Sequence, residues 1–232
     1  MPKILTRAAG AAALALLATS PAAAANLLTN GGFEGAPANN FGTYYRGPLA
    51  PDGWSRVAGL EAPDILDDAY GQGGGGFLVL LDPQEGDRFL DMNGGSPTGG
   101  LYQDVTGLTA GALVTLTYWV GQWAQNSAGT LAASLLDASN QAVLSGQTTT
   151  IAYAPGAQTS SWTRYTLTAL APTSGAVRVQ FTGDSGSTAR GAPGLDNVML
   201  EAGVPEPSTW ALMIAGFGVA GVGLRRRRPA RA

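Results

Sequence analysis

Two segments in the second half of the chain alternate between apolar and polar side chains. In residues 113–120, Val, Leu and Tyr occupy every second position, and in residues 176–182 two Val and a Phe alternate with Arg178 and Gln180. This period of two is typical of β-strands with one buried face. Shorter stretches predict further strands at 77–81, 88–92, 101–105, 131–136, 142–144, 163–169 and 195–201. Turn residues separate nearly all of them, so we expect an all-β, two-sheet sandwich.

The first 25 residues have the pattern of a secretory signal peptide. Lys3 and Arg7 precede an apolar run at 8–17, and small residues follow as far as Ala25. Ten apolar residues are too few to cross about 30 Å of hydrocarbon. We therefore expect cleavage after Ala25 rather than a membrane anchor, with the sandwich occupying residues 26–203.

Residues 204–232 have three parts. Pro-Glu-Pro stands at 205–207, an uncharged run follows at 208–224, and the tail at 225–232 begins with four arginines. As a helix, the uncharged stretch with Pro207 is about 27 Å long, which is enough for one transmembrane span. The arginines favour the cytoplasmic side, so the preceding domain is expected outside the cytoplasm.

This tail resembles the PEP-CTERM sorting signal, in the variant with Trp210-Ala211 after the Pro-Glu-Pro. The same type of segment is also called an ice-binding protein C-terminal domain. The resemblance implies an exported Gram-negative protein that is anchored transiently in the inner membrane. An exosortase-type transpeptidase would process it near Pro-Glu-Pro, and it would reach the cell surface or the extracellular biofilm matrix, in association with exopolysaccharide. The residues implied in sorting are Pro205, Glu206, Pro207, Trp210, Arg225, Arg226, Arg227 and Arg228.

Composition restricts the chemistry of the middle of the chain. Residues 26–204 carry 15 acidic side chains against six arginines, a net charge of −9, which argues against a nucleic-acid partner. The chain has no Cys and no His. This excludes thiol nucleophiles, imidazole relays and thiolate zinc sites, and leaves oxygen chemistry of the kind that suits calcium or sugars.

A second resemblance covers nearly the whole middle of the chain. Its motifs lie at 26–34, 51–54, 87–91, 101–105, 107–108, 111–118, 162 and 194–198. The series resembles the galactose-binding-like jelly roll of carbohydrate-binding modules and DUF642-type wall proteins. That fold implies first and last strands side by side, with Glu34 and Asp196 as the leading ligands of a structural Ca2+. The alternative is that Glu34 caps a turn and Asp196 hydrogen-bonds a loop. Asp64, Asp67 and Asp68 are interpreted as a solvated loop face, with a second calcium site as the alternative.

Sugar binding requires aromatic platforms with polar groups beside them. The available tyrosines are Tyr44, Tyr45 and Tyr70. The residues expected to contact a ligand are Trp119, Trp123, Arg178 and Gln180, and the alternative for the tryptophans is packing. Trp54 and Trp162 are expected in the core.

The sequence favours a non-catalytic protein that binds or co-assembles with exopolysaccharide. Asp87 could pair with Asp91 or Glu85 for carboxylate catalysis. Residues four apart along a strand, however, are separated by over about 12 Å, and we expect no second domain that would form a groove for a polymer. One alternative is a structural adhesion or assembly protein that does not recognise sugar. Ice binding is another, but the chain lacks a regular Thr repeat.

Overall fold

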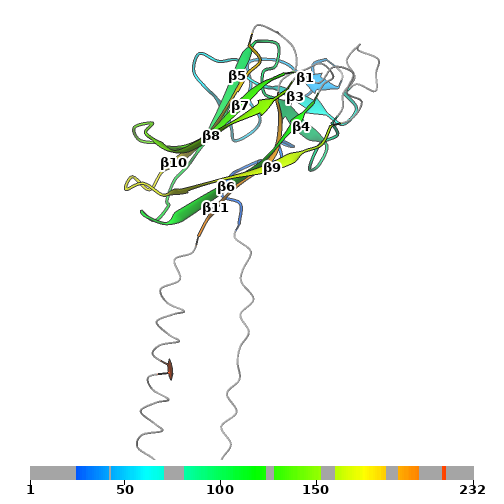
Figure 1. Cartoon of the computed structure of the whole chain (residues 1–232). Coiled ribbons are helices and arrows are strands. Elements are labelled where there is room, and N and C mark those ends of the chain that lie inside the picture. The colour runs from blue at the N-terminus through cyan, green and yellow to red at the C-terminus, as the bar shows by residue number, and fades with distance from the viewer. Residues whose placement is uncertain are drawn as a thin grey trace, which may run out of the picture.

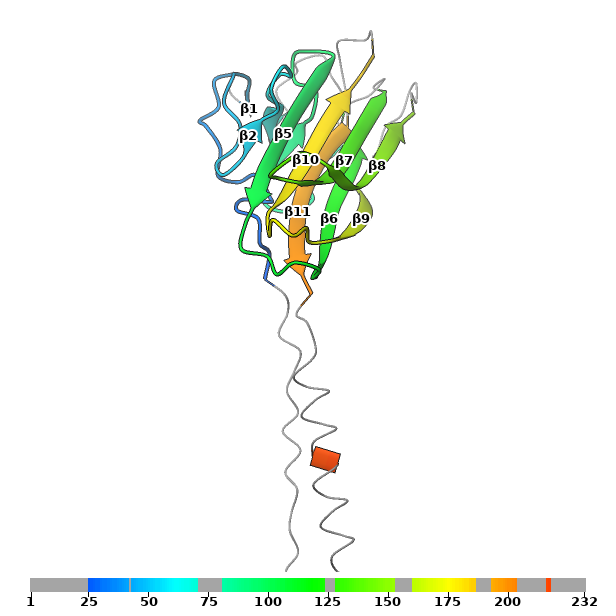
Figure 2. The ribbon, with the colours of Figure 1, turned by 90° about the vertical axis from the view of Figure 1, so that its left-hand side faces the viewer.

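Two antiparallel β-sheets pack face to face (Figures 1 and 2). The structure, a computed structural model, describes residues 25–41, 43–70, 81–123, 128–152, 160–186, 193–203 and 216–217. The six-stranded sheet has the order β1 (Tyr44–Tyr45), β3 (Asp64–Asp67), β4 (Arg88–Asp91), β11 (Pro193–Ala202), β6 (Leu113–Gln122), β9 (Thr163–Leu170). The five-stranded sheet has the order β2 (Ser55–Arg56), β5 (Thr98–Val105), β10 (Val177–Asp184), β7 (Gly129–Asp137), β8 (Val143–Ile151). This is the predicted all-β jelly-roll sandwich.

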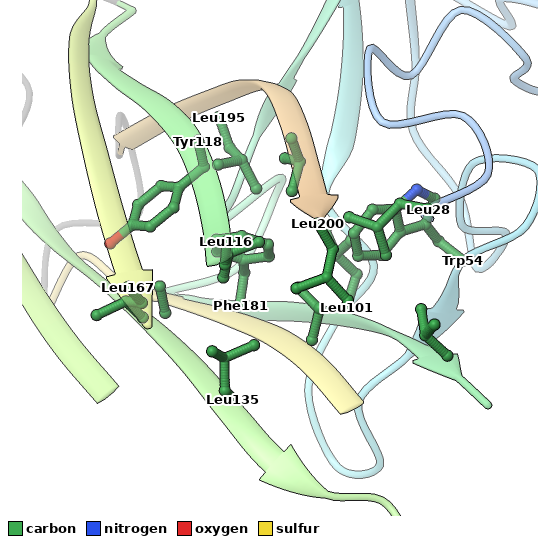
Figure 3. Close-up of a cluster of buried hydrophobic side chains, with 14 of the residues drawn as sticks. Leu28, Trp54, Leu101, Leu116, Tyr118, Leu135, Leu167, Phe181, Leu195 and Leu200 are labelled. Carbon is green, nitrogen blue, oxygen red and sulfur yellow. The ribbon is translucent and has the colours of Figure 1, made fainter. Parts of the chain in front are cut away.

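The core fills the space between the two sheets (Figure 3). Tyr118 from β6 meets Phe181 from β10 edge to face, with ring centroids 5.2 Å apart. Trp54 packs on the other side of Phe181 at 6.3 Å. These residues come from both sheets and are buried, as the alternation in β6 and β10 predicts. The prediction that Trp54 belongs to the core is confirmed.

The N-terminal segment lies along β11. The Leu27 N–H donates to the Leu200 carbonyl at 2.8 Å, and the Val198 N–H donates to the Gly31 carbonyl at 2.9 Å. Close approach requires glycine at position 31, because a Cβ there would lie 1.9 Å from the Val198 carbonyl oxygen. The expected adjacency of the first and last segments is therefore confirmed.

The structure describes few residues of the two predicted terminal segments. The predicted signal peptide (1–25) and sorting segment (204–232) lie outside the described residues, apart from Ala25 and residues 216–217. Within the described ranges, the structure contains no helix with the length and hydropathy of a membrane span. The predicted strand at 77–81 also falls outside, except for Leu81, which is not in a strand.

Candidate functional site

A second apolar cluster covers part of the outer face of the six-stranded sheet. Leu66 of β3 and Phe89 of β4 are cross-strand partners that point away from the core, because their neighbours Ile65 and Leu90 point into it. The cluster consists of buried Leu66, Leu81, Phe89 and Trp123 with half-buried Tyr44, Tyr70 and Trp162. Trp162 thus packs outside the main core, so its prediction as a core residue is only partly met.

Glycines in the sheet make room for this cluster. A Cβ on Gly121 of β6 would lie 2.7 Å from Leu81 Cδ2, and one on Gly194 of β11 would lie 3.3 Å from both Leu81 and Trp162. The Trp162 indole also donates a 2.7 Å hydrogen bond to the Asp82 carbonyl. The chain around Leu81 and Asp82 is therefore held against the sheet.

Two carboxylates face each other beside this cluster. Asp64 begins β3, Asp91 ends β4, and the two residues are direct cross-strand partners, each only 2% exposed. Arg46 donates from Nε to Asp64 Oδ2 at 2.8 Å and from Nη2 to the same oxygen at 2.5 Å. The Arg46 side chain is 46% exposed. We call Arg46, Asp64 and Asp91 the polar triad.

The triad holds one ion pair and one carboxyl without a cationic partner of its own. Burial raises the pKa of Asp64 despite the opposing effect of Arg46, and the hydrogen bond from Arg46 to Asp64 raises the pKa of the guanidinium. Burial, and secondly the charge of Asp64, raise the pKa of Asp91 to about 7. The Asn93 N–H donates to Asp91 Oδ1 at 3.1 Å and opposes that rise only partly.

An aromatic row runs beside the triad. Phe41 stacks on Tyr44 with centroids 5.0 Å apart, Tyr44 meets Tyr70 edge to face at 5.1 Å, and Tyr70 lies 5.9 Å from Trp123. The row passes from a 56% exposed ring at Phe41 to a 6% exposed one at Trp123. The Arg46 guanidinium lies 5.5 Å from the Tyr44 centroid. The row and the triad therefore meet at Tyr44 and Arg46, and we take the two together as the candidate site.

This arrangement combines ring faces with polar groups at a fixed spacing, which is what a sugar or another polar cyclic ligand requires. The interpretation of Asp64 as a solvated loop residue was wrong, because Asp64 is buried at a strand end. The sequence analysis also missed Arg46 as a site residue. One signal that points to Asp64 and Asp91 is that each adjoins a two-residue apolar run: Asp64 stands before the run at 65–66, and Asp91 follows the run at 89–90.

The two predicted calcium ligands, Asp196 and Glu34, accept hydrogen bonds from the two ends of one loop. Asp196 Oδ2 accepts hydrogen bonds from the Gln84 and Glu85 N–H groups at 2.7 and 3.1 Å, and its Oδ1 accepts from the Asn197 N–H at 2.6 Å. Glu34 Oε1 accepts from the N–H groups of Asp87 and Arg88 at 2.9 and 3.1 Å. Residues 84–88 are thus held by one carboxylate from the N-terminal segment and one from β11, the last strand.

The electrostatics of this pair suit a cation. Asp196 is fully buried, and its burial, with a smaller contribution from the charge of Glu34, raises its pKa to about 7. A cation would relieve the repulsion between the two carboxylates, and hard oxygen donors are the ligands that calcium prefers. Within the described ranges, no three His, Cys, Asp or Glu side chains gather to hold a metal. Backbone carbonyls and water would therefore have to supply the remaining ligands.

The four predicted ligand-binding residues do not meet. Trp123 belongs to the aromatic row. Half-buried Trp119 lies on the same outer face, directly between Asp196 of β11 and Arg164 of β9.

Arg178 and Gln180 lie on the outer face of the five-stranded sheet, on the other side of the sandwich. Arg178 forms a bidentate pair with Asp104 at 2.6 and 2.8 Å and stacks on Tyr102 at 3.7 Å. Its Nη1 also donates to Gln141 at 3.0 Å. The Arg178 guanidinium is therefore held by hydrogen bonds and stacking with side chains of the protein itself.

Comparison with known proteins adds two findings. Residues 203–228 match the family model described as the PEP-CTERM protein-sorting motif. Among curated proteins, no sequence matches the chain.

Similar solved structures share the sandwich at low sequence identity. A cyclase from Fischerella sp. TAU is 17% identical with a TM-score of 0.54, over 78% of this chain and 98% of that chain. Arabinose-bound MgGH51 α-L-arabinofuranosidase is 17% identical with a TM-score of 0.50, over 78% of this chain and 27% of that one. TmCBM61 in complex with β-1,4-galactotriose is 14% identical with a TM-score of 0.44, over 77% of this chain and 99% of that chain. The chain thus combines a jelly-roll β-sandwich with a PEP-CTERM protein-sorting motif, which implies export, transient membrane anchoring and processing by an exosortase.

Proposed function

We propose that this protein is an exported, exosortase-sorted surface or matrix protein whose sandwich binds exopolysaccharide at the aromatic row and polar triad. The observation that carries the proposal is the graded exposure of the row beside Arg46. Phe41 offers a ring to solvent, Tyr44 continues the stack, and the guanidinium presents donors to hydroxyl groups at the same place. Ring faces bind the apolar faces of sugars, and charged donors fix their orientation.

Binding without catalysis suits the carboxylates of this site. Asp64 is held by Arg46, and Asp91 is 2% exposed, so neither is presented to a ligand as a proton donor or nucleophile. The fold itself is shared with a cyclase and a glycosidase, so the proposal rests on the site and not on the fold. The competing function is a structural assembly protein whose sandwich contacts other proteins.

Calcium is the cofactor that we propose for the Glu34–Asp196 pair. When bound, the ion would supply positive charge that links the N-terminal segment, residues 84–88 and β11. These two side chains would be its acidic ligands, and neither belongs to the proposed glycan surface.

Replacing Phe41 with alanine should weaken glycan binding by about tenfold, which corresponds to about 1.4 kcal/mol. Phe41 is 56% exposed, so its truncation removes a stacking face without opening the core. Leu49→Ala is the matched control, because Leu49 is equally exposed and the aromatic row does not include it. Binding is measured by calorimetry against glycans isolated from the matrix. If folded wild-type protein binds none of them, the assembly function replaces this proposal.

The sorting motif makes a separate prediction about the mature C-terminus. Intact mass of the naturally exported protein should place its end near Pro205–Pro207, with Arg225–Arg228 removed. Glu206→Ala should retain the precursor in the inner membrane, whereas Glu201→Ala, before the motif, should be processed normally. Intact Arg225–Arg228 in the surface fraction would contradict processing at this position.

A further inference from the structure

The end of the sandwich from which the chain enters the sorting motif carries exposed leucines. Leu27, Leu113 and Leu170 are 38%, 50% and 62% exposed. The Leu27 N–H bonds to Leu200 near the end of β11, the Gly203 N–H bonds to the Leu113 carbonyl at 2.7 Å, and Leu170 is the cross-strand partner of Leu113. We call these three leucines the exit patch. Figures 1 and 2 show the start of the N-terminal segment and the end of β11 side by side at this end of the sandwich.

The connections around this end carry no charge, although the domain as a whole is strongly acidic. Residues 106–112, between β5 and β6, contain no Asp, Glu, Lys or Arg, and neither do residues 171–176, between β9 and β10. Three acidic residues lie nearby: Asp104 is paired with Arg178, Glu201 is half-buried, and Asp137 at the end of β7 is buried and accepts hydrogen bonds from Ser139 and Ser174.

Carboxylates gather toward the opposite end. Exposed Glu61 pairs with Gly99 near the start of β5, and exposed Asp184 ends β10. An anionic lipid surface repels exposed carboxylates within about a Debye length, whereas an end whose carboxylates are paired or largely buried meets a weaker barrier. The distribution of charge therefore favours one orientation of the domain over a membrane.

The sequence places a membrane within reach of the exit patch. The sorting motif match begins at residue 203, and the uncharged run expected to span the bilayer begins at residue 208. The intervening residues 204–207 span at most about 14 Å when fully extended. A domain tethered so closely cannot move its exit end far from the lipid surface.

We propose that the exit patch rests on the phospholipid surface while the precursor is anchored. This rests on the membrane anchoring that the proposed function includes. Exposed leucines would enter the interfacial region, as apolar side chains of peripheral proteins do. The aromatic row lies beside the first residues of β11, at the other end of that strand, so this orientation turns the proposed glycan surface away from the membrane.

The experiment uses the full chain in vesicles of phosphatidylethanolamine and phosphatidylglycerol. The chain has no Cys, so Leu170→Cys introduces a single site for an environment-sensitive fluorophore. Thr150→Cys is the matched control. Thr150 is exposed near the end of β8, in the row that continues through Thr130 to Asp184 at the far end of the sandwich. Retention on vesicles after an alkaline wash reports anchoring independently of the fluorophore.

Both labelled proteins should stay on the vesicles. The label at position 170 should show a blue-shifted emission that nitroxide lipid quenches, and the label at position 150 should show neither effect. Retention with the same aqueous emission at both positions would overturn the exit patch proposal and leave the anchoring intact. A label at 170 shielded from both nitroxide lipid and a water-soluble quencher would mean that a second protein copy covers the patch, which also overturns it. Loss of retention would overturn the anchoring and this proposal together.

Discussion

Replacing Asp196 with alanine is expected to lower the free energy of unfolding by about 3 to 6 kcal/mol, because three partly buried backbone donors lose a charged acceptor. The N–H groups of Gln84, Glu85 and Asn197 all donate to this one carboxylate, which is fully buried. Such a loss is a large part of the roughly 5–15 kcal/mol that stabilises a domain. Urea unfolding in chelator measures it.

Asp184→Ala is the matched control for this experiment. Asp184 is exposed, and among the residues that the structure describes the Gly186 N–H donates to it, so its removal should cost less than about 1 kcal/mol. Similar losses in the two variants would mean that Asp196 does not hold residues 84–88.

The same variant tests the proposed calcium site. Added calcium should raise the unfolding midpoint of the wild type, because an ion that binds only the folded state stabilises it. Asp196→Ala should abolish this response. The response should also be stronger above pH 7 than at pH 5.5, because calcium must displace a proton from a carboxyl whose pKa is about 7. An equal midpoint rise in Asp196→Ala would place the ion elsewhere.

Side-chain alternation was sufficient to predict the long strands. The patterns at 113–120 and 176–182 correspond to β6, an interior strand of the six-stranded sheet, and β10, the central strand of the five-stranded sheet. β1 and β2 were not predicted, because two residues are too short to show a period. β8 extends to Ile151, far beyond the predicted 142–144. The pattern did not show this extension because residues 145–150 are Ser, Gly, Gln and Thr, so the inward positions are polar as well as the outward ones.

The candidate site was harder to predict because its parts come together only through sheet pairing. Asp64 and Asp91 are 27 positions apart, and nothing local indicates that β3 pairs with β4 so that they face each other. Trp123 was expected near a ligand, but only the fold shows that Tyr70 links it to the surface rings. Arg178 looked available because its strand position faces outward, and its partner Asp104 belongs to another strand.

Raising the pH from 5 to 8 is expected to destabilise the domain through Asp91. Burial and the Asp64 charge raise the pKa of Asp91 from 3.8 to about 7 in the folded protein. Between these values the folded state holds a proton that the unfolded state has released, so stability falls by about 1.4 kcal/mol per pH unit. The stabilising contribution of protonated Asp91 is therefore fully present below about pH 4 and is lost as the pH passes 7. The loss over the whole range is on the order of 4 kcal/mol, of which about 3 kcal/mol falls between pH 5 and pH 8.

Asp91→Asn separates this effect from that of Asp196, which titrates in the same direction. Asparagine keeps an oxygen for the Asn93 N–H but cannot ionise, so the variant should match the wild type near pH 4, where Asp91 is protonated in both folded and unfolded states, and show a shallower pH dependence. At pH 8 it should be more stable than the wild type, because a buried carboxylate beside Asp64 is costly. Urea unfolding at both pH values, in chelator, gives the comparison. If Asp91→Asn is the less stable protein at pH 8, then Arg46 and the backbone donors around Asp91 suffice to stabilise both negative charges, and the triad is ionised throughout.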